Sequence, residues 1–241
     1  MNARPGVFIS TVSARIPLIV FLAITVAQVS CGAEKKDASA ETIKGMEAQA
    51  MVLFKQSNYA GAEAEFRAIQ KIQERVLGPE HPDTLQSRDK AAGMLWSQGK
   101  FPEVQAELRA ILKIRRRILG PEHPDTLLTW HNVASVLRAQ GKFQDAVREH
   151  RAVLQVRERV LGPYHTNTLE SFFHLSLNLD AAGEFDEARL YAWQATTGAR
   201  KTFGPDHPTT KLYERLHYEL PKDGRPKRRS LSDTNAVQGR P

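Results

Sequence analysis

The sequence predicts an all-α fold, a solenoid of repeated helix pairs. Residues 77–85 of this 241-residue chain read LGPEHPDTL, and the same letters return at 119–127. Weaker copies begin at Leu161 and Phe203, so successive copies lie 42 residues apart. A fixed period of this length is typical of repeat proteins, in which each unit packs mainly on its neighbours. Residues 42–219 also lack the strict apolar–polar alternation that predicts strands.

Four units of equal length follow from this period, at 42–83, 84–125, 126–167 and 168–209. Each is expected to hold a first helix, a short turn such as 98–101 (QGKF), and a longer second helix. Pro82 is expected to keep the next helix from starting early, and Asp83 or Thr84 to cap it through a side-chain oxygen. An amphipathic segment at 208–220 is predicted to form a helix that caps the C-terminal end of the array.

The first 33 residues have the layout of an export signal. Basic residues precede an apolar run at 16–27, which is short for a membrane span. The sole cysteine, Cys31, follows Ser30 in a stretch that resembles the lipobox of bacterial lipoproteins. This resemblance implies lipidation of Cys31, with the protein anchored in a membrane and facing the periplasm or the exterior. Secretion as a soluble protein after cleavage behind Ala33, or an uncleaved anchor, are the alternatives.

The net charge of +7 resides mainly outside the repeats. Residues 42–219 contain 24 Lys and Arg against 22 Asp and Glu, after a linker at 34–41. The tail at 220–241 carries six basic and two acidic residues and is rich in Pro, Gly and Ser, a composition that predicts disorder. The folded body is therefore nearly neutral, and no nucleic-acid partner is expected.

No local catalytic or metal-binding motif occurs in the chain, so no catalytic residue, cofactor or metal ion is expected. A single cysteine excludes a cysteine-rich metal cage. Histidine recurs once in each interrepeat loop, at His81, His123, His165 and His207. Copies one repeat apart lie on the order of 10 Å from each other, too far to share an ion, so these histidines are expected to cap helices or pack the loops.

The helix pairs, with their small and Phe or Tyr positions, resemble tetratricopeptide repeats, and the 42-residue unit with its LGPEHPDTL linker resembles the kinesin-light-chain type. The resemblance implies a right-handed superhelix whose concave face, lined by the first helix of each pair, holds a peptide or a partner helix. In kinesin-type repeats an Asn six residues after the Thr of the unit reaches that groove. Asn132 matches this position, whereas the other units carry Ala48, Lys90 and His174.

Helical projection places the residues six and ten positions after the start of a unit on one face of the first helix. The predicted groove residues are Lys90, Met94, Asn132, Val136, His174 and Asn178. A stripe of mixed polar and apolar residues suits capture of a peptide or helix. The sequence thus predicts a non-enzymatic scaffold for protein–protein interaction. The alternatives are a self-associating structural component and an enzyme with dispersed catalytic residues.

Overall fold

The computed structural model describes residues 40–221. The predicted export signal with Cys31, the linker up to residue 39 and the tail from residue 222 lie outside the described residues. Within 40–221 all regular structure is α-helical, which confirms the predicted class. After a first helix at 40–55, the helices are α2 (Tyr59–Leu77), α3 (Pro82–Ser97), α4 (Phe101–Ile118), α5 (Pro124–Ala139), α6 (Phe143–Leu161), α7 (Thr166–Ala182), α8 (Phe185–Phe203) and α9 (Pro208–Glu219).

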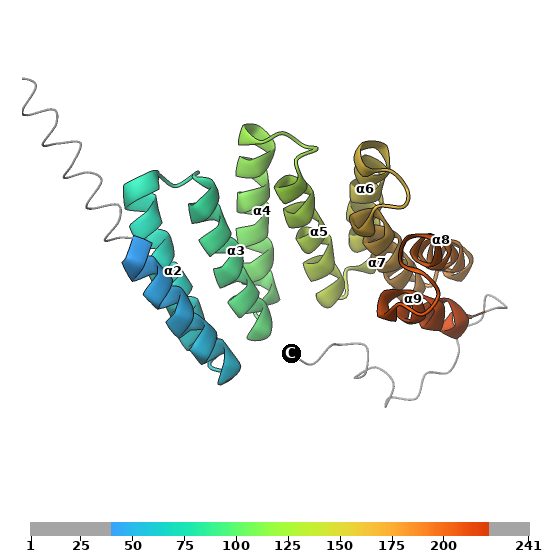
Figure 1. Cartoon of the computed structure of the whole chain (residues 1–241), viewed down its shortest axis with the longest axis horizontal. Coiled ribbons are helices and arrows are strands. Elements are labelled where there is room, and N and C mark those ends of the chain that lie inside the picture. Colours follow the sequence, from blue (N-terminus) through green and yellow to red (C-terminus); the bar gives the residue numbers. More distant parts are fainter. Residues whose placement is uncertain (1–39, 222–241) are drawn as a thin grey trace, which may run out of the picture.

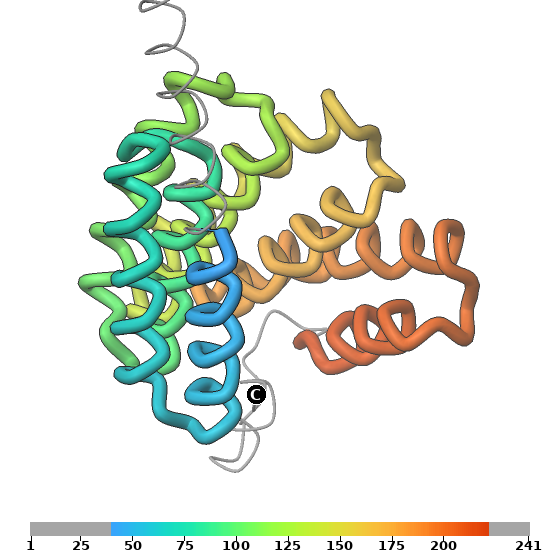
Figure 2. The backbone as a smooth tube through the Cα atoms, turned by 60° about the vertical axis from the view of Figure 1, so that its left-hand side comes forward, coloured from blue at the N-terminus to red at the C-terminus, as the bar shows by residue number. Residues whose placement is uncertain are grey.

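Each helix from α2 onward packs against the next one along the chain. Figure 1 shows the helices standing in a row that bends into an arch, with α2 near one end and α9 at the other. In Figure 2 the helices at the blue end run vertically and those at the red end horizontally, so the helix axes turn along the row. A row of helix pairs that turns as it advances is a solenoid, as predicted.

The first helix of each unit after the first begins two or three residues earlier than predicted, because its cap is a histidine. His81 is the N-cap of α3, and its Nδ1 accepts a hydrogen bond from the backbone N–H of Asp83 at 3.2 Å. The same bond forms in the other three loops, at His123, His165 and His207. Asp83 and Thr84 are therefore not the caps. Pro82 lies inside the helix at its first position, where a fixed φ and a missing N–H are tolerated.

Thr84 has a different role, which its burial shows. Its side chain is fully buried, and its hydroxyl donates to the carbonyl of Gly78 at 2.9 Å, across the loop. Thr210 repeats this bond to Gly204 at 2.8 Å. The turn inside a unit also follows the sequence pattern, since Gly99 has a φ of +74°, a value that L side chains rarely adopt. The repeated letters therefore specify loop geometry.

Both helices of a unit bury small residues. Ala134 of α5 and Ala146 of α6 are both fully buried. Larger side chains, such as Leu137 and Val104, fill the space between units two and three. Three apolar clusters run along the array in this way, and the largest lies in the C-terminal third, where α9 packs on α8.

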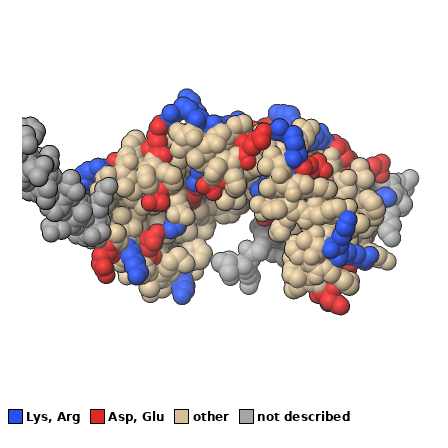
Figure 3. Space-filling view, turned by 45° about the horizontal axis from the view of Figure 1, so that its top comes forward, with Lys and Arg blue, Asp and Glu red and all other residues tan. Residues whose placement is uncertain are grey.

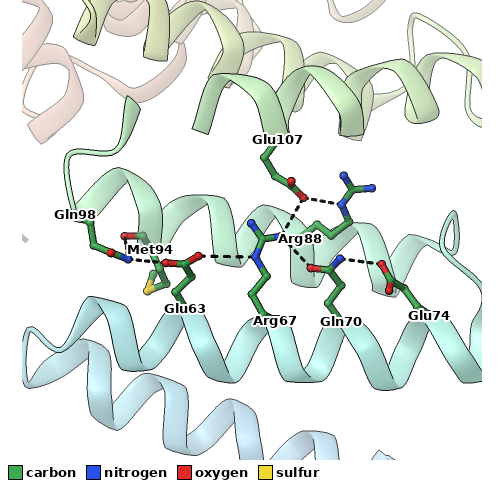
Figure 4. Close-up of polar contacts among 8 residues, drawn as sticks. All are labelled: Glu63, Arg67, Gln70, Glu74, Arg88, Met94, Gln98 and Glu107. Atoms are coloured by element: carbon green, nitrogen blue, oxygen red, sulfur yellow. Dashed lines mark hydrogen bonds and ion pairs between the residues drawn. The ribbon is translucent and has the colours of Figure 1, made fainter. Parts of the chain in front are cut away.

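Polar contacts also join neighbouring units. Glu107 of α4 accepts hydrogen bonds from Arg88 of α3 at 2.7 Å and from Arg67 of α2 at 3.3 Å (Figure 4). One period later, Arg109 of α4 donates to Glu149 of α6 at 3.3 Å. Because the positions are equivalent, the second helices of consecutive units are linked by the same type of ion pair.

Candidate functional site

Three predicted groove residues occupy one repeated position on three consecutive first helices. Lys90 of α3, Asn132 of α5 and His174 of α7 are 42 residues apart, and all three are half-buried. Lys90 interacts with residues of unit one. Its Nζ forms an ion pair with Glu47 Oε1 at 2.6 Å and lies 5.6 Å from the centre of the Phe66 ring. This position therefore stays partly accessible along the array but differs chemically from unit to unit.

The residues four positions further on are less accessible. Met94 is half-buried, whereas Val136 and Asn178 are completely buried. The structure thus places Val136 and Asn178 in the interior, where they cannot contact a partner without rearrangement. Helical projection shows that residues four apart share a side of the helix, but it does not show how much of that side the next unit covers. The accessible part of the predicted stripe consists of Lys90, Met94, Asn132 and His174.

His174 belongs to a second arrangement, which no motif in the sequence predicts. His131 of α5, His150 of α6 and His174 of α7 converge, with ring centres 4.8 Å apart for His131 and His150 and 4.7 Å apart for His131 and His174. His131 and His150 are buried and His174 is half-buried. One ligand-type nitrogen from each ring lies within 4.8 Å of those of the other two. We call this group the histidine cluster.

Burial keeps the histidine cluster uncharged at neutral pH. Desolvation lowers the pKa of His150 from 6.5 to about 3, with a further contribution from His174. Desolvation and the charges of Arg138 and Arg157 lower the pKa of His174 to about 4. The pKa of His131 is also well below its usual value, chiefly because the ring is buried. All three rings are therefore neutral imidazoles at pH 7.

The hydrogen bonds of the histidine cluster are incomplete. Nδ1 of His150 lies 2.8 Å from the amide nitrogen of Asn178 and 3.3 Å from the carbonyl oxygen of Ala146. Three buried atoms have no hydrogen-bond partner: His131 Nδ1, His150 Nε2 and Asn178 Oδ1. Most buried polar atoms in proteins are paired, and three of the thirteen unpaired ones in the described chain lie together here.

Repeat alignment carries a signal that points to this site. The positions equivalent to His150 are Phe66, Leu108 and Ala192, all of them buried and apolar. The positions equivalent to Asn178 are also apolar, namely Val52, Met94 and Val136. Two positions that are apolar in the other units thus become polar and buried at the junction of units three and four, and the two polar side chains contact each other.

The outer surface carries charges of both signs. In Figure 3, basic and acidic side chains are interspersed on the face shown, and the surface is hollowed between the two ends of the arch. Such mixing agrees with the near balance of charge in residues 42–219. In the described part of the chain, no helix is both long and apolar enough to span a membrane.

Comparison with known proteins identifies the class. The tetratricopeptide-repeat family model matches residues 41–116, 90–148 and 125–201, which together cover more than half of the chain. The chain therefore belongs to the tetratricopeptide-repeat family, as its 42-residue units predict. Repeat proteins of this family generally act as scaffolds without enzymatic activity. A search of curated proteins found no match.

Solved structures agree on the fold. A Podosopora anserina protein with nearly identical TPR-like repeats of the kinesin-light-chain kind is 24% identical, with a TM-score of 0.64, over 73% of this chain and 83% of that one. BtubC (BKLC) from P. vanneervenii is 13% identical, with a TM-score of 0.66, over 79% and 80% of the two chains. The apo form of RapI is also 13% identical, with a TM-score of 0.64, over 83% and 72%. These likenesses define the fold.

Proposed function

We propose that this protein is a non-enzymatic scaffold that holds a peptide or a helix of a partner protein on the concave side of its arch. The main support is the repeated position occupied by Lys90, Asn132 and His174, which remains partly accessible on three consecutive first helices. An extended or helical ligand that follows the array would meet one of these side chains in each of units two, three and four.

The chemistry of these side chains suits a peptide. Asn132 has both a donor and an acceptor and can pair with the N–H and C=O of a ligand backbone. Met94 offers a flexible apolar surface, which adapts to different side chains. Lys90 already pairs with Glu47, so an acidic ligand group would compete with that carboxylate. The three chemistries together favour a ligand that has apolar side chains and an accessible backbone.

Binding through this face is tested by capture from an envelope extract with matched variants. Asn132→Arg places a long cation in the groove, while Arg148→Glu changes an exposed side chain on α6. We expect wild type and Arg148→Glu to recover the same partner, and Asn132→Arg to recover at least about tenfold less, the loss typical of a disrupted binding hot spot. Equal recovery by Asn132→Arg would overturn the assignment of the groove.

The same proposal includes export and membrane attachment through Cys31. It is supported by the order of basic residues, apolar run, Ser30 and Cys31 in the sequence. Cys31→Ser removes the thiol that would carry the lipid, and we expect the protein to move from the membrane fraction to the soluble fraction. Retention of the variant in the membrane would show an uncleaved anchor instead, and a soluble wild type would show secretion without a lipid.

Self-association is a second candidate, favoured by apolar side chains on the outermost described helices. Met51 and Val52 are about half exposed on the first helix, and Leu212 and Tyr218 are exposed on α9. Open ends of a solenoid stack when they are apolar. Sedimentation across a wide concentration range decides: a mass that rises with concentration supports stacking, and a constant monomer mass rules it out.

A further inference from the structure

We propose that the histidine cluster, His131, His150 and His174, binds a divalent transition-metal ion of the zinc type. Three imidazoles are a ligand set that such ions favour in proteins. The rings come from three helices and two units, α5 and α6 of unit three and α7 of unit four. An ion held there would join the two units. This inference does not depend on the proposed scaffold function.

The geometry is close to that of a metal site. The ligand-type nitrogens lie within 4.8 Å of one another. Two nitrogens bound to one tetrahedral zinc ion are about 3.3 Å apart, given Zn–N bonds of about 2.0–2.1 Å. Small rotations of the side chains, moving each nitrogen by on the order of 1 Å, would close the site around an ion. His174 is half-buried, which gives the ion access from solvent.

Two unpaired ring nitrogens of the histidine cluster are suited to act as metal ligands. His131 Nδ1 and His150 Nε2 are buried and have no hydrogen-bond partner. The carbonyl of Ala146 lies 3.3 Å from Nδ1 of His150, so this ring can donate from Nδ1 and keep a lone pair on Nε2. Histidine ligands of metals are commonly held in this way, with the second nitrogen donating to a carbonyl oxygen. A metal ion would use the lone pair that is otherwise unsatisfied.

Asn178 fits the same arrangement. Its amide lies 2.8 Å from His150 Nδ1, and its Oδ1 has no partner. If the amide is turned by 180°, the oxygen accepts from the Nδ1–H of His150, and both the tautomer and the ring orientation are fixed. The amide orientation follows from the hydrogen-bond network, because oxygen and nitrogen are nearly equal in size. Asn178 would then be a positioning residue, one step removed from the ion.

The repeat pattern argues against a purely structural role. Leu108 and Ala192 occupy the position of His150 in the neighbouring units, so an apolar side chain satisfies the fold there. A buried polar group without full pairing lowers stability. A histidine and an asparagine at two such positions, in contact with each other, therefore carry a cost that the fold does not require and that a bound ion would offset.

Neighbouring charges set an upper bound on affinity. Arg138 and Arg157 lower the pKa of His174 by their positive charge, and the same field disfavours a divalent cation. Arg157 is partly compensated, since its guanidinium lies 3.6 Å from Glu170 and donates to Ser171. We therefore expect the site to bind more weakly than a closed structural zinc site.

The experiment titrates the chelator-treated full chain, in a Cys31→Ser background and without a histidine tag, with Zn²⁺ by calorimetry and with Co²⁺ by visible absorption. Each histidine variant takes the residue that another unit has at the equivalent position, so it is expected to fold: His150→Leu follows Leu108, and His174→Asn follows Asn132. His165→Asn is the control, because it removes a histidine outside the cluster and keeps a good N-cap residue.

We expect the parent chain and His165→Asn to bind one ion per chain, with the intense Co²⁺ bands of a tetrahedral site. His150→Leu and His174→Asn are expected to bind at least about 10- to 100-fold more weakly, because loss of an outer partner alone costs a metal site this much and each variant loses a direct ligand. Circular dichroism identifies any variant that fails to fold, and the remaining one then decides. Absence of binding to the parent chain, or binding by a folded variant equal to that of His165→Asn, would overturn the proposal.

Discussion

Histidines have two different roles in this chain, as helix caps in the loops and as members of a buried cluster between units three and four. The loop histidines recur with the period, and their predicted capping role is confirmed by the bonds from Nδ1 to the backbone. The histidine cluster was not predicted, because His131, His150 and His174 lie on three different helices and form no local motif. Only the packing of the helices brings them together. The sequence signal for the histidine cluster is that His150 departs from the residues at the equivalent positions of the other units.

Folding stability is expected to fall as the pH drops below neutrality. In the unfolded chain the cluster histidines have a pKa near 6.5. In the folded chain the pKa is about 4 for His174 and about 3 for His150. The unfolded state thus holds more protons in this window, so the stability present above pH 6.5 is lost as the pH falls. His150 and His174 each account for about 1–2 kcal/mol of this loss between pH 7 and pH 5.

Urea unfolding at several pH values, in the presence of a chelator, measures how the free energy of unfolding changes with pH. His174→Asn removes one of the three groups and is expected to show a shallower dependence. His165→Asn removes an exposed histidine and is expected to match wild type. Equal slopes for wild type and His174→Asn between pH 7 and pH 5 would contradict the assigned environment.

At the scale of the helix, the residue before each of the first three loop histidines contacts a basic residue of a second helix. The contacting positions are equivalent in the three copies, but the type of interaction changes. Glu80 pairs with Arg117 in the first copy, and Glu122 pairs with Arg159 at 2.7 Å in the next. In the third copy the loop residue is Tyr164, and Lys201 lies 3.9 Å above the centre of its ring. An ion pair is replaced by a cation–π contact at equivalent positions. The period predicts that these positions meet, and the residue types specify how.

The close approach of α5 and α6 gives a prediction at this scale. Ala134 of α5 is fully buried, so Ala134→Trp is expected to lower the free energy of unfolding by about 1–3 kcal/mol or more through overpacking. Ala139, at the end of the same helix, is exposed, and Ala139→Trp is expected to change it by less than about 0.5 kcal/mol. Chemical denaturation measures both, and equal effects would contradict the placement of Ala134.

At the scale of the molecule, the period predicts the solenoid but leaves the exposure of its faces undetermined. Each helix packs mainly on the next one along the chain, so the order of elements follows directly from the order of repeats. Val136 and Asn178 show the limit of this reasoning, because they lie on the predicted side of their helices yet are buried by neighbouring elements. How much of a helix face the next unit covers depends on the rotation between successive units. This rotation results from all the contacts between them.

In a solenoid each repeat contacts only its neighbours, so a destabilising substitution is expected to loosen the nearby helices and to leave distant ones unchanged. Tyr213 of α9 is buried and stacks on Phe173 with ring centres 4.6 Å apart. Tyr213→Ala is expected to increase hydrogen exchange in α7 to α9 and to leave α2 and α3 unchanged. Tyr218→Ala, at an exposed position of the same helix, is expected to have little effect. Equal loss of protection along the whole array would contradict this picture of local coupling.

Binding of a partner along the first helices is measured by site-specific photo-crosslinking in intact cells, with a crosslinker placed at Asn132 in one strain and at Arg148 on the exposed side of α6 in another. We expect a discrete crosslinked partner from position 132 that is absent from position 148. The same products from both positions, or a discrete partner from position 148 alone, would contradict it.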